Sequence, residues 1–432
     1  MWGSTTSRCG STRRAINSLA VTLGVTASLL LAGCQSAQDT QSPKSADKSA
    51  EDTQSQNQRA FLGTLFSGAE QFENFSRINE LLPTSRMAPA PTPVDFPLGE
   101  PIELPSSFRY GGQAVNTADF LRETDTSALL VVQAGQVRFE RYSLTGGRNV
   151  NWLSMSVAKS FVSALIGIAV AEGHIASIEE PVTDYVPGLA GSAYDGVAIK
   201  DILQMSSGAR WNEDYSDPNS DVARLAGLLL EGASFTEFSK TLVRENAPGT
   251  VNLYNSTDTQ VLGELLSAAT GKSLTQYMHE KLWQPLGMES PGYWIVDNFG
   301  VEMAFGGLNA TARDYAKLGE LYRNDGRWQG EQVVPKNWVA ASLTADAPHL
   351  LPSNNSLGMG YGYQWWLMDG EQGDYSAIGV YNQFIYVHPT AQLVIVKLSA
   401  NSDYALTNEE SSYRELESVE FFRAIAQRIT TE

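Results

Sequence analysis

Short apolar runs occur in two pairs, one near the front of the chain's main body and one near its end. Ala128–Gln133 and Val137–Tyr142 flank a turn that contains glycine, and Gln383–His388 and Leu393–Leu398 flank a turn that contains proline. Apolar runs rich in Val, Ile and Phe on either side of a turn are typical of β-hairpins. The pattern therefore predicts one antiparallel hairpin at each end of the body.

Between the two hairpins, apolar residues recur at the three- and four-residue spacing of amphipathic helices. Helices are predicted at Val157–Glu172, Val222–Leu230, Gln260–Ala269, Leu274–Leu282 and Ala312–Arg323, and after the second hairpin at Glu415–Ile429. Strands at both ends with helices between them predict an α+β fold. We expect an antiparallel sheet flanked by helices, with a mostly helical subdomain inserted into it.

The segments before the body differ from it in composition. Residues 34–60 are rich in Gln, Ser, Asp, Lys and Ala and have no apolar period, so they cannot bury enough surface to offset the entropy of ordering. We expect them to form a disordered tether. Phe61–Leu82 has a helical pattern and residues 83–105 are rich in proline, which predicts an N-terminal arm over 61–105 and a main domain over 106–432.

The first 33 residues have the pattern of an export signal. Arginines 8, 13 and 14 precede the uncharged stretch Leu19–Leu31, which is too short for a typical membrane span. The stretch ends in Leu-Ala-Gly-Cys34, which resembles the bacterial lipobox. We expect a lipid on Cys34, a membrane-anchored exported protein and, since Gln35 follows, retention in the outer membrane. The alternative to lipidation is an ordinary secretory signal with a chance cysteine. The pair Arg13-Arg14 also leaves twin-arginine export open.

Composition excludes several classes of function. The formal net charge is -18, which argues against nucleic acid as a partner because phosphate binding needs a basic face. The two cysteines lie within the first 34 residues, so the body has no thiol nucleophile or thiolate metal site. The four histidines show no metal-binding spacing. We expect no metal and no cofactor.

Candidate chemistry begins with Ser156 and Lys159, an S-x-x-K motif at the start of a predicted helix. Residues three apart share a helix face, and the helix N-terminus favours negative charge that develops on the serine oxygen. A desolvated lysine can accept the serine proton. The nearly all-apolar helix after the motif predicts a buried site. The alternative is a capping serine beside a solvated lysine, and a second match, Ser45 to Lys48, lies in the tether.

Further motifs follow in order along the chain. Tyr254-Asn-Ser256 precedes a helical segment, and here the chain resembles the serine β-lactamase/DD-peptidase superfamily, whose second motif is Tyr-x-Asn or Ser-x-Asn. The stretches 201–208, 285–288 and 306–314 also resemble that superfamily. The resemblance covers about residue 100 to the end. It implies a β-lactamase/transpeptidase-like fold, Ser156 as nucleophile, Lys159 as general base and Tyr254 as proton relay.

Two departures narrow the resemblance. The third motif of the superfamily is usually Lys-Thr-Gly, or His-x-Gly in esterase-like members, whereas the matching stretch 377–383 reads Ala-Ile-Gly-Val-Tyr-Asn-Gln. The second motif ends in Ser256 instead of asparagine. Both features are similar to the 6-aminohexanoate-dimer hydrolase and carboxylesterase branch, although Asn382 replaces a glycine of that branch. Ester or small-amide hydrolysis is therefore favoured over penicillin turnover.

The resemblance also implies residues around the nucleophile. The oxyanion would be held by the backbone amides of Ser156 and Val380, while Gly379 lets the strand pass close to the substrate. Tyr215 lies where this branch places a mobile tyrosine over the substrate. Substrate contacts are further expected at Ser256, Trp365 and Trp366, although both tryptophans also fit plain core packing.

The function expected is hydrolysis of small ester or amide substrates through an acyl-enzyme on Ser156. Two alternatives remain open. A DD-peptidase or β-lactamase would act on cell-wall peptides or penicillins, and a catalytically silent lipoprotein would have kept the fold for binding.

Overall fold

The computed structural model describes residues 43–354 and 358–431. The chain divides into two units, Met1–Ser49 and Ala50–Glu432, and the second contains the main domain. The predicted signal peptide and Cys34 lie outside the described residues. Among the residues that are described, no helix is both long and apolar enough to cross a bilayer.

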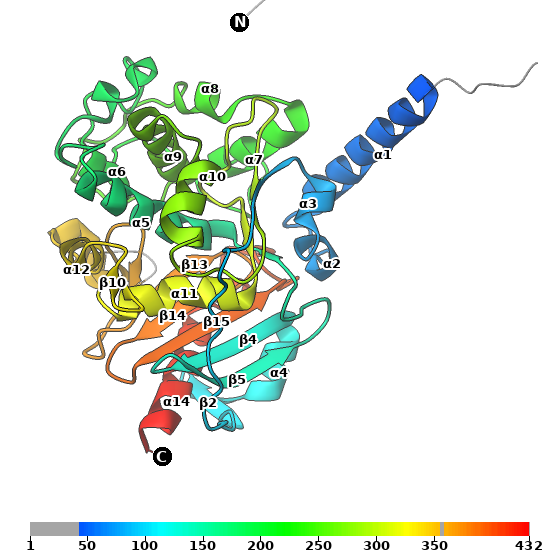
Figure 1. Ribbon diagram of the computed structural model, residues 1–432, viewed down its shortest axis with the longest axis vertical. Coiled ribbons are helices and arrows are strands. Elements are labelled where there is room, and N and C mark those ends of the chain that lie inside the picture. Colours follow the sequence, from blue (N-terminus) through cyan, green and yellow to red (C-terminus); the bar gives the residue numbers. More distant parts are fainter. Residues whose placement is uncertain (1–42, 355–357, 432) are drawn as a thin grey trace, which may run out of the picture. The chain divides into compact units, whose positions relative to one another are not determined.

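A seven-stranded antiparallel sheet forms the centre of the second unit (Figure 1). Its strand order is β11-β12-β13-β14-β15-β4-β5, so the two predicted hairpins lie side by side although about 240 residues separate them. The strands are β11 Gly360–Tyr361, β12 Trp366–Leu367, β13 Tyr375–Gly379, β14 Gln383–His388, β15 Leu393–Ser399, β4 Thr126–Gln133 and β5 Gln136–Tyr142.

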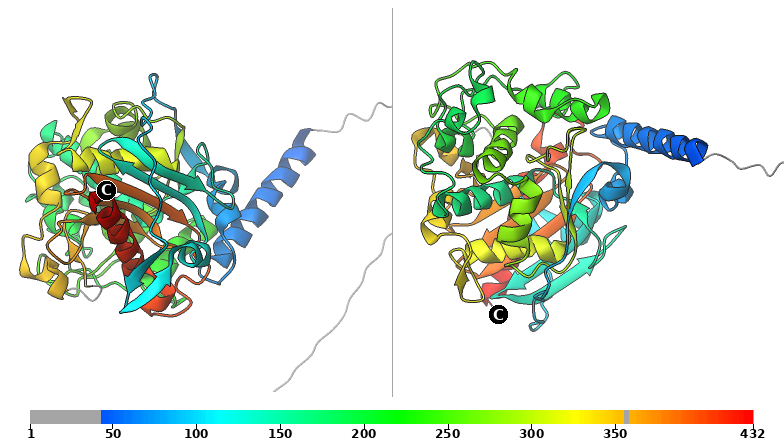
Figure 2. Two further views of the ribbon diagram at one scale, coloured as in Figure 1. Left: turned by 90° about the horizontal axis from the view of Figure 1, so that it is seen from below. Right: turned by 45° about the horizontal axis from the view of Figure 1, so that its top comes forward.

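The sheet is buried on both faces, which explains the continuous apolar runs of its central strands. Leu129 and Val131 of β4 pack into one core with helix α14 (Glu415–Thr431), whereas Leu130 and Val132 pack into the other core with α5 and α11. Successive strand residues point to opposite faces, so one strand serves both cores. Figure 2 shows α14 lying across its face of the sheet.

The helical subdomain is inserted between β5 and the later strands. Its helices are α5 Ala158–Ala171, α6 Ile199–Leu203, α7 Asp221–Glu231, α8 Phe235–Ser239, α9 Ser256–Thr270 and α10 Leu274–Met278, which continues as a π-helical turn at His279–Trp283. A second sheet, in the order β1-β7-β8-β6, joins Thr84–Met87, Gly292–Ile295, Leu308–Ala310 and Trp152–Leu153. The prediction of an α+β fold with a helical insertion is confirmed.

Smaller elements complete the domain. They are α2 Phe72–Phe75, α3 Ile78–Leu81, β2 Ser107–Tyr110, β3 Gln113–Asn116, α4 Thr117–Glu123, α11 Ala312–Arg323, β9 Arg327–Trp328, β10 Glu331–Gln332, α12 Lys336–Ser342 and α13 Glu410–Tyr413.

The structure corrects the prediction for the N-terminal segments. Helix α1 covers Pro43–Thr64, so the expected disordered tether is helical over residues 43–60, and its first residues, 34–42, lie outside the described part of the chain. Its Ala, Lys, Glu, Gln and Arg residues are strong helix formers, a local preference that an argument from apolar burial overlooks. The single helix expected over Phe61–Leu82 is also wrong. Phe66 and Gly68 have φ of 56° and 79°, which ends the helix before α2 and α3.

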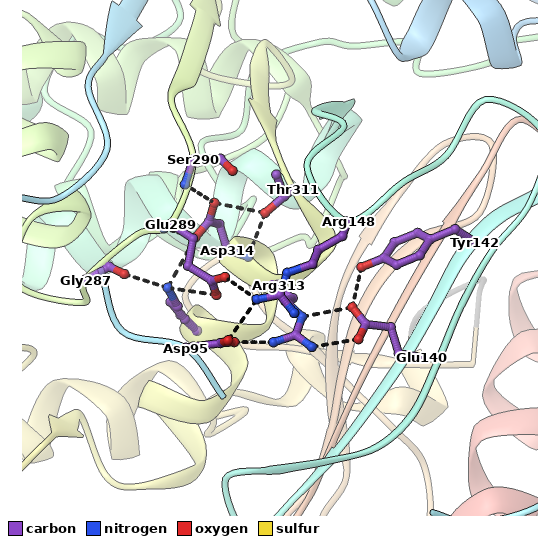
Figure 3. A network of polar contacts seen from close by, with 11 residues as sticks. Asp95, Glu140, Tyr142, Arg148, Gly287, Glu289, Ser290, Thr311, Arg313 and Asp314 are labelled. Atoms are coloured by element: carbon purple, nitrogen blue, oxygen red, sulfur yellow. Dashed lines mark hydrogen bonds and ion pairs between the residues drawn. The ribbon is translucent and has the colours of Figure 1, made fainter. Parts of the chain in front are cut away.

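A buried polar network fixes α11 against the sheet and the loop before β7 (Figure 3). Arg313 donates two hydrogen bonds to Glu140 of β5, at 2.8 and 2.6 Å, and also pairs with Asp95. Asp314 accepts hydrogen bonds from the backbone amides of Glu289 and Ser290 at 2.7 and 3.1 Å. Buried charges persist only when paired in this way. The network holds the start of α11, which directly follows β8, the strand that pairs with β6.

Candidate active site

Ser156 lies where a short strand turns into a buried helix. Strand β6 ends at Leu153, Met155–Val157 form one 3-10 turn, and α5 starts at Ala158. Twelve of the fourteen residues of α5 are buried, so the helix is fixed in the core and cannot shift the serine. The serine side chain remains slightly accessible, with 9% of its surface exposed. Ser156 is therefore rigidly held yet reachable.

Lys159 is buried one helical turn after Ser156. Its Nζ lies 2.9 Å from Ser156 Oγ, 3.2 Å from Ser256 Oγ and 2.7 Å from the carbonyl oxygen of Phe305. Burial lowers the pKa of the lysine to about 7, although the nearby carboxylates of Glu213 and Asp258 act in the opposite direction. A substantial share of the amine is thus neutral near pH 7, as a base must be.

Tyr254 approaches the same pair from the loop that precedes α9. Its side chain lines the same cavity as Ser156, and Lys159 Nζ lies 5.1 Å from the centre of its ring. Trp366 stacks on that ring at 5.2 Å between centroids. Burial raises the pKa of Tyr254 well above its ordinary value, with a further rise from Glu213. The phenol keeps its proton at neutral pH and can donate it to a leaving group.

Gly379 ends strand β13 directly beside the nucleophile. A Cβ atom at this position would stand 2.7 Å from Ser154 O and 2.9 Å from Ser156 N, distances that a real side chain does not reach. Glycine therefore lets β13 pass against the turn that carries Ser156. Val380 follows it and lines the same cavities as Ser156. Among the described backbone hydrogen bonds outside helices and strands, neither the Ser156 amide nor the Val380 amide is a donor.

Sequence reasoning missed one residue of the site, Glu213. Its carboxylate accepts hydrogen bonds from Ser256 Oγ at 2.6 Å, Ser256 N at 3.0 Å and the Tyr215 hydroxyl at 2.6 Å, and it also contacts Trp211. Ser256 thus bridges Lys159 and Glu213. In the sequence, Glu213 is one acid in a polar loop, and only its place two residues before Tyr215 could have drawn attention to it.

The structure separates the two tryptophans predicted to contact substrate. Trp366 lines a cavity at Ser156, as expected of a substrate contact. Trp365 is fully buried, with its ring 4.6 Å from Tyr322 and 5.4 Å from Tyr375, and it lines neither cavity at the nucleophile. The substrate contact at Trp365 is therefore wrong. Trp365 directly precedes β12, and successive residues of an extended segment point to opposite sides, so only one of the two tryptophans faces the site.

Two cavities meet at Ser156 and share Tyr215 and Val380 as a common border. The apolar pocket, of about 450 Å³, is lined by Leu62, Leu65, Phe66, Met155, Ser156, Tyr215, Ser216, Pro218, Val222, Ala223, Ala226, Gly227, Leu230, Ser256, Met303, Phe305, Gly306 and Val380. The polar pocket, of about 500 Å³, is lined by residues that include Glu213, Asp214, Tyr254, Trp366, Tyr404, Asn408, Glu410, Tyr413 and Glu415.

Charge distinguishes the two pockets. No charged side chain lines the apolar pocket, and among the described residues that line the polar pocket four are acidic and none is a lysine or arginine. Burial raises the pKa of Glu415 to about 7, so this carboxyl gains charge as the pH rises through neutrality. Over residues 43–354 and 358–431, no group of three or more His, Cys, Asp or Glu is arranged as metal ligands.

Comparisons with known proteins agree with this architecture. Residues 118–418 match the family model described as Beta-lactamase. A 6-aminohexanoate-dimer hydrolase of Paenarthrobacter ureafaciens is 34% identical over 346 residues, which cover 76% of this chain and 85% of that protein. A solved structure described as "Putative 6-aminohexanoate-dimer hydrolase from Bacillus anthracis" superposes with a TM-score of 0.74 at 24% identity, covering 83% of this chain and 94% of that one. The hydrolase EstCE1 gives a TM-score of 0.58 at 16% identity, over 72% of this chain and 96% of its own.

Proposed function

The chain belongs to the β-lactamase family and is a serine hydrolase, and from that premise we propose that it cleaves small esters or amides through an acyl-enzyme on Ser156. One observation carries the proposal: the buried amine of Lys159 lies 2.9 Å from Ser156 Oγ. A nucleophile within hydrogen-bond reach of a base with a lowered pKa is the arrangement that acyl transfer requires.

Acylation would begin when Lys159 accepts the proton of Ser156 and the serine oxygen attacks the substrate carbonyl. The oxygen of that carbonyl gains negative charge, which the amides of Ser156 and Val380 would stabilise. Lys159 is then an ammonium and Tyr254 can pass its phenolic proton to the departing group while it recovers one from the lysine. The position of Tyr254 supports this path, because its side chain lines the polar pocket together with Ser156 and its ring centre lies 5.1 Å from Lys159 Nζ.

Deacylation would use the same groups in reverse. Water enters the position that the leaving group has vacated, loses a proton towards Tyr254 and Lys159, and attacks the acyl carbon. Ser156 leaves with a proton and the acid is released. The buried chain from Lys159 through Ser256 to Glu213 supports the step, since it holds the amine 2.9 Å from Ser156 Oγ.

The charges of the polar pocket favour an esterase or amidase over a penicillin-directed enzyme. Penicillins and D-alanyl peptides carry a carboxylate beside the scissile bond, and relatives grip it with Lys-Thr-Gly. Here the matching residues are Ala377, Ile378 and Gly379, and the pocket beside them is acidic. The 34% identical relative is named for hydrolysis of the 6-aminohexanoate dimer, a linear amide, which supports a small linear substrate.

Replacement of the nucleophile tests the proposal. Ser156→Ala should reduce hydrolysis of p-nitrophenyl acetate by at least about 10⁴-fold. Ser160→Ala is the matched control, because Ser160 lies on the same helix but hydrogen-bonds to Gln364 O at 2.7 Å, outside both cavities. A fluorophosphonate probe should label wild-type Ser156, as read by peptide mass spectrometry. Full activity of the alanine variant would contradict the proposal.

The same sample separates the alternatives. Absence of any adduct on the folded protein would favour a silent binding lipoprotein. Rapid turnover of nitrocefin, or a stable adduct with a fluorescent penicillin, would favour a β-lactamase or DD-peptidase instead.

We also propose that the enzyme is anchored to a membrane by a lipid on Cys34, with the outer membrane as its place. The support is the Leu-Ala-Gly-Cys34 sequence after an uncharged stretch. Cells that express Cys34→Ala should not incorporate labelled palmitate into the protein, whereas Cys9→Ala should leave the label in place. Palmitate in the Cys34→Ala protein would overturn the anchor.

A further inference from the structure

The apolar pocket is closed on one side by a segment outside the residues that match the family model. That match starts at residue 118, whereas Leu62, Leu65 and Phe66 lie more than fifty residues earlier. Helix α7 contributes Val222, Ala223, Ala226, Gly227 and Leu230 to the same pocket. The pocket wall is therefore a property of this chain's N-terminal arm as much as of its family fold.

Phe66 is fixed in that wall by three independent contacts. Its backbone amide donates to the Tyr381 hydroxyl at 2.8 Å, and its ring stacks on Tyr381 with 5.2 Å between centroids and 17° between planes. The ring also lies 5.0 Å from Tyr215, on the border between the two pockets. A residue held at φ 56° by such contacts is part of a built surface.

The position of the proton donor indicates which half of the substrate lies in each pocket. Tyr254 lines the polar pocket and not the apolar one. Because Tyr254 would give its proton to the leaving group, that group must lie in the polar pocket. The acyl group then has to extend from Ser156 to the other side.

We propose that the apolar pocket binds the acyl half of the substrate as an uncharged hydrocarbon chain, and that Leu62, Leu65 and Phe66 set its length. The inference rests on the proposed acyl-enzyme at Ser156 and names its substrate class: esters or amides of medium-chain apolar acids. A chain that ends in an ammonium group finds no counter-charge in this pocket, because none of the lining side chains is charged. Burying an unpaired charge there is strongly unfavourable.

A series of p-nitrophenyl esters tests the assignment on the wild-type protein. From acetate through butyrate to hexanoate, kcat/KM should rise with each methylene, by up to about fourfold per group when it is fully buried. The kcat/KM for the heptanoate ester should exceed that for the 6-aminohexanoate ester by at least about tenfold, because the latter has the same chain length but ends in an ammonium group. A flat or falling series, or a preference for the ammonium ester, would overturn the inference.

Filling the pocket gives a second, structural test. An added Cβ at Gly227 meets no atom within 4 Å, so Gly227→Leu should place its side chain in the pocket without a clash. The hexanoate-to-acetate ratio of kcat/KM should fall at least about tenfold. Gly63→Leu is the matched control: this glycine also lies in a helix with open space around it, but it is exposed and lines neither pocket.

Opening the wall should have the opposite effect. Phe66→Ala removes the ring between α1 and Tyr215. The decanoate-to-hexanoate ratio of kcat/KM should therefore rise several-fold above the wild-type ratio. An unchanged decanoate-to-hexanoate ratio would show that the N-terminal arm does not select substrates by chain length. Acetate turnover that depends on Ser156 together with an unselective length series would refute this inference alone, whereas no Ser156-dependent turnover would refute the proposed function and this inference with it.

Discussion

The two pockets that meet at Ser156 have similar volumes, about 450 and 500 Å³, but opposite chemistry. The apolar pocket is lined by Leu, Phe, Val, Ala and Met side chains from the N-terminal arm, α7 and residues 303–306. The polar pocket gathers four carboxylates and several aromatic rings from residues 213–215, 252–254 and 404–415. On the proposed assignment of the acyl group and the leaving group to these pockets, the enzyme would distinguish the two halves of its substrate by polarity.

Tyr215 explains how such different surfaces can lie so close together. Its ring contacts Phe66 of the apolar pocket at 5.0 Å, while its hydroxyl donates to Glu213 of the polar pocket at 2.6 Å. A tyrosine has an apolar body and a polar tip, so one side chain can form the wall between the two. The comparison predicts that changes at the shared border affect all substrates alike and that changes on one side act selectively.

The largest effect should come from Lys159, which acts on Ser156 at the point where the two pockets meet. Lys159→Met keeps the bulk of the side chain but cannot accept a proton, so kcat/KM should fall by about 10² to 10⁴-fold for acetate and hexanoate esters equally. Lys397→Met is the matched control, because Lys397 is also fully buried but lies on β15 away from both pockets. Steady-state kinetics with both esters would measure the fall in kcat/KM. A loss of kcat/KM confined to one ester would contradict a reacting centre that serves both pockets.

A smaller effect should come from charge on the leaving group. Hexanoylcholine should be cleaved about tenfold faster, in kcat/KM, than its uncharged isostere 3,3-dimethylbutyl hexanoate, because the polar pocket offers carboxylates and aromatic rings to a cation. The advantage should grow as the pH rises through about 7, since the carboxyl of Glu415 ionises there. It should shrink with added salt. Equal rates at every pH and salt concentration would show that the acidic lining does not contact the leaving group.

The smallest effect should be a shift of the pH profile. For a neutral ester, kcat/KM should rise with pH up to about 7 and then level, because Lys159 must lose its proton to act as base. The Glu213 carboxylate stabilises the ammonium form and so raises the pKa of Lys159. Glu213→Gln should therefore move the rising limb to lower pH, by up to about one unit.

Asp214→Asn provides the matched control for that shift. Asp214 lines the same polar pocket but hydrogen-bonds to Ser216 at the surface and is not among the groups that shift the pKa of Lys159. A pH profile that moves equally in both variants, or to higher pH in Glu213→Gln, would show that Glu213 does not act on the lysine.

The local pattern of apolar and polar residues was sufficient to predict many of the helices and strands. The hairpins at 128–142 and 383–398 and the helices around Ser156, Gln260 and Ala312 lie within a few residues of their predicted bounds. These segments have strong periodicity and end at turn or capping residues, such as Asn255, which caps α9. Helix α1 was missed because its stability derives from residue propensity instead of an apolar face.

The sequence by itself determined the order of the motifs, because S-x-x-K at 156–159 and Tyr-x-Ser at 254–256 are short, local patterns that a helix start and a capped loop preserve. Only the tertiary structure decided that Lys159 is buried, that Glu213 joins it through Ser256, that Trp365 faces the core, and that Leu62 and Phe66 form a wall beside Ser156. The physical reason is that burial and charge proximity depend on contacts between residues far apart in the chain, and no local pattern encodes those contacts.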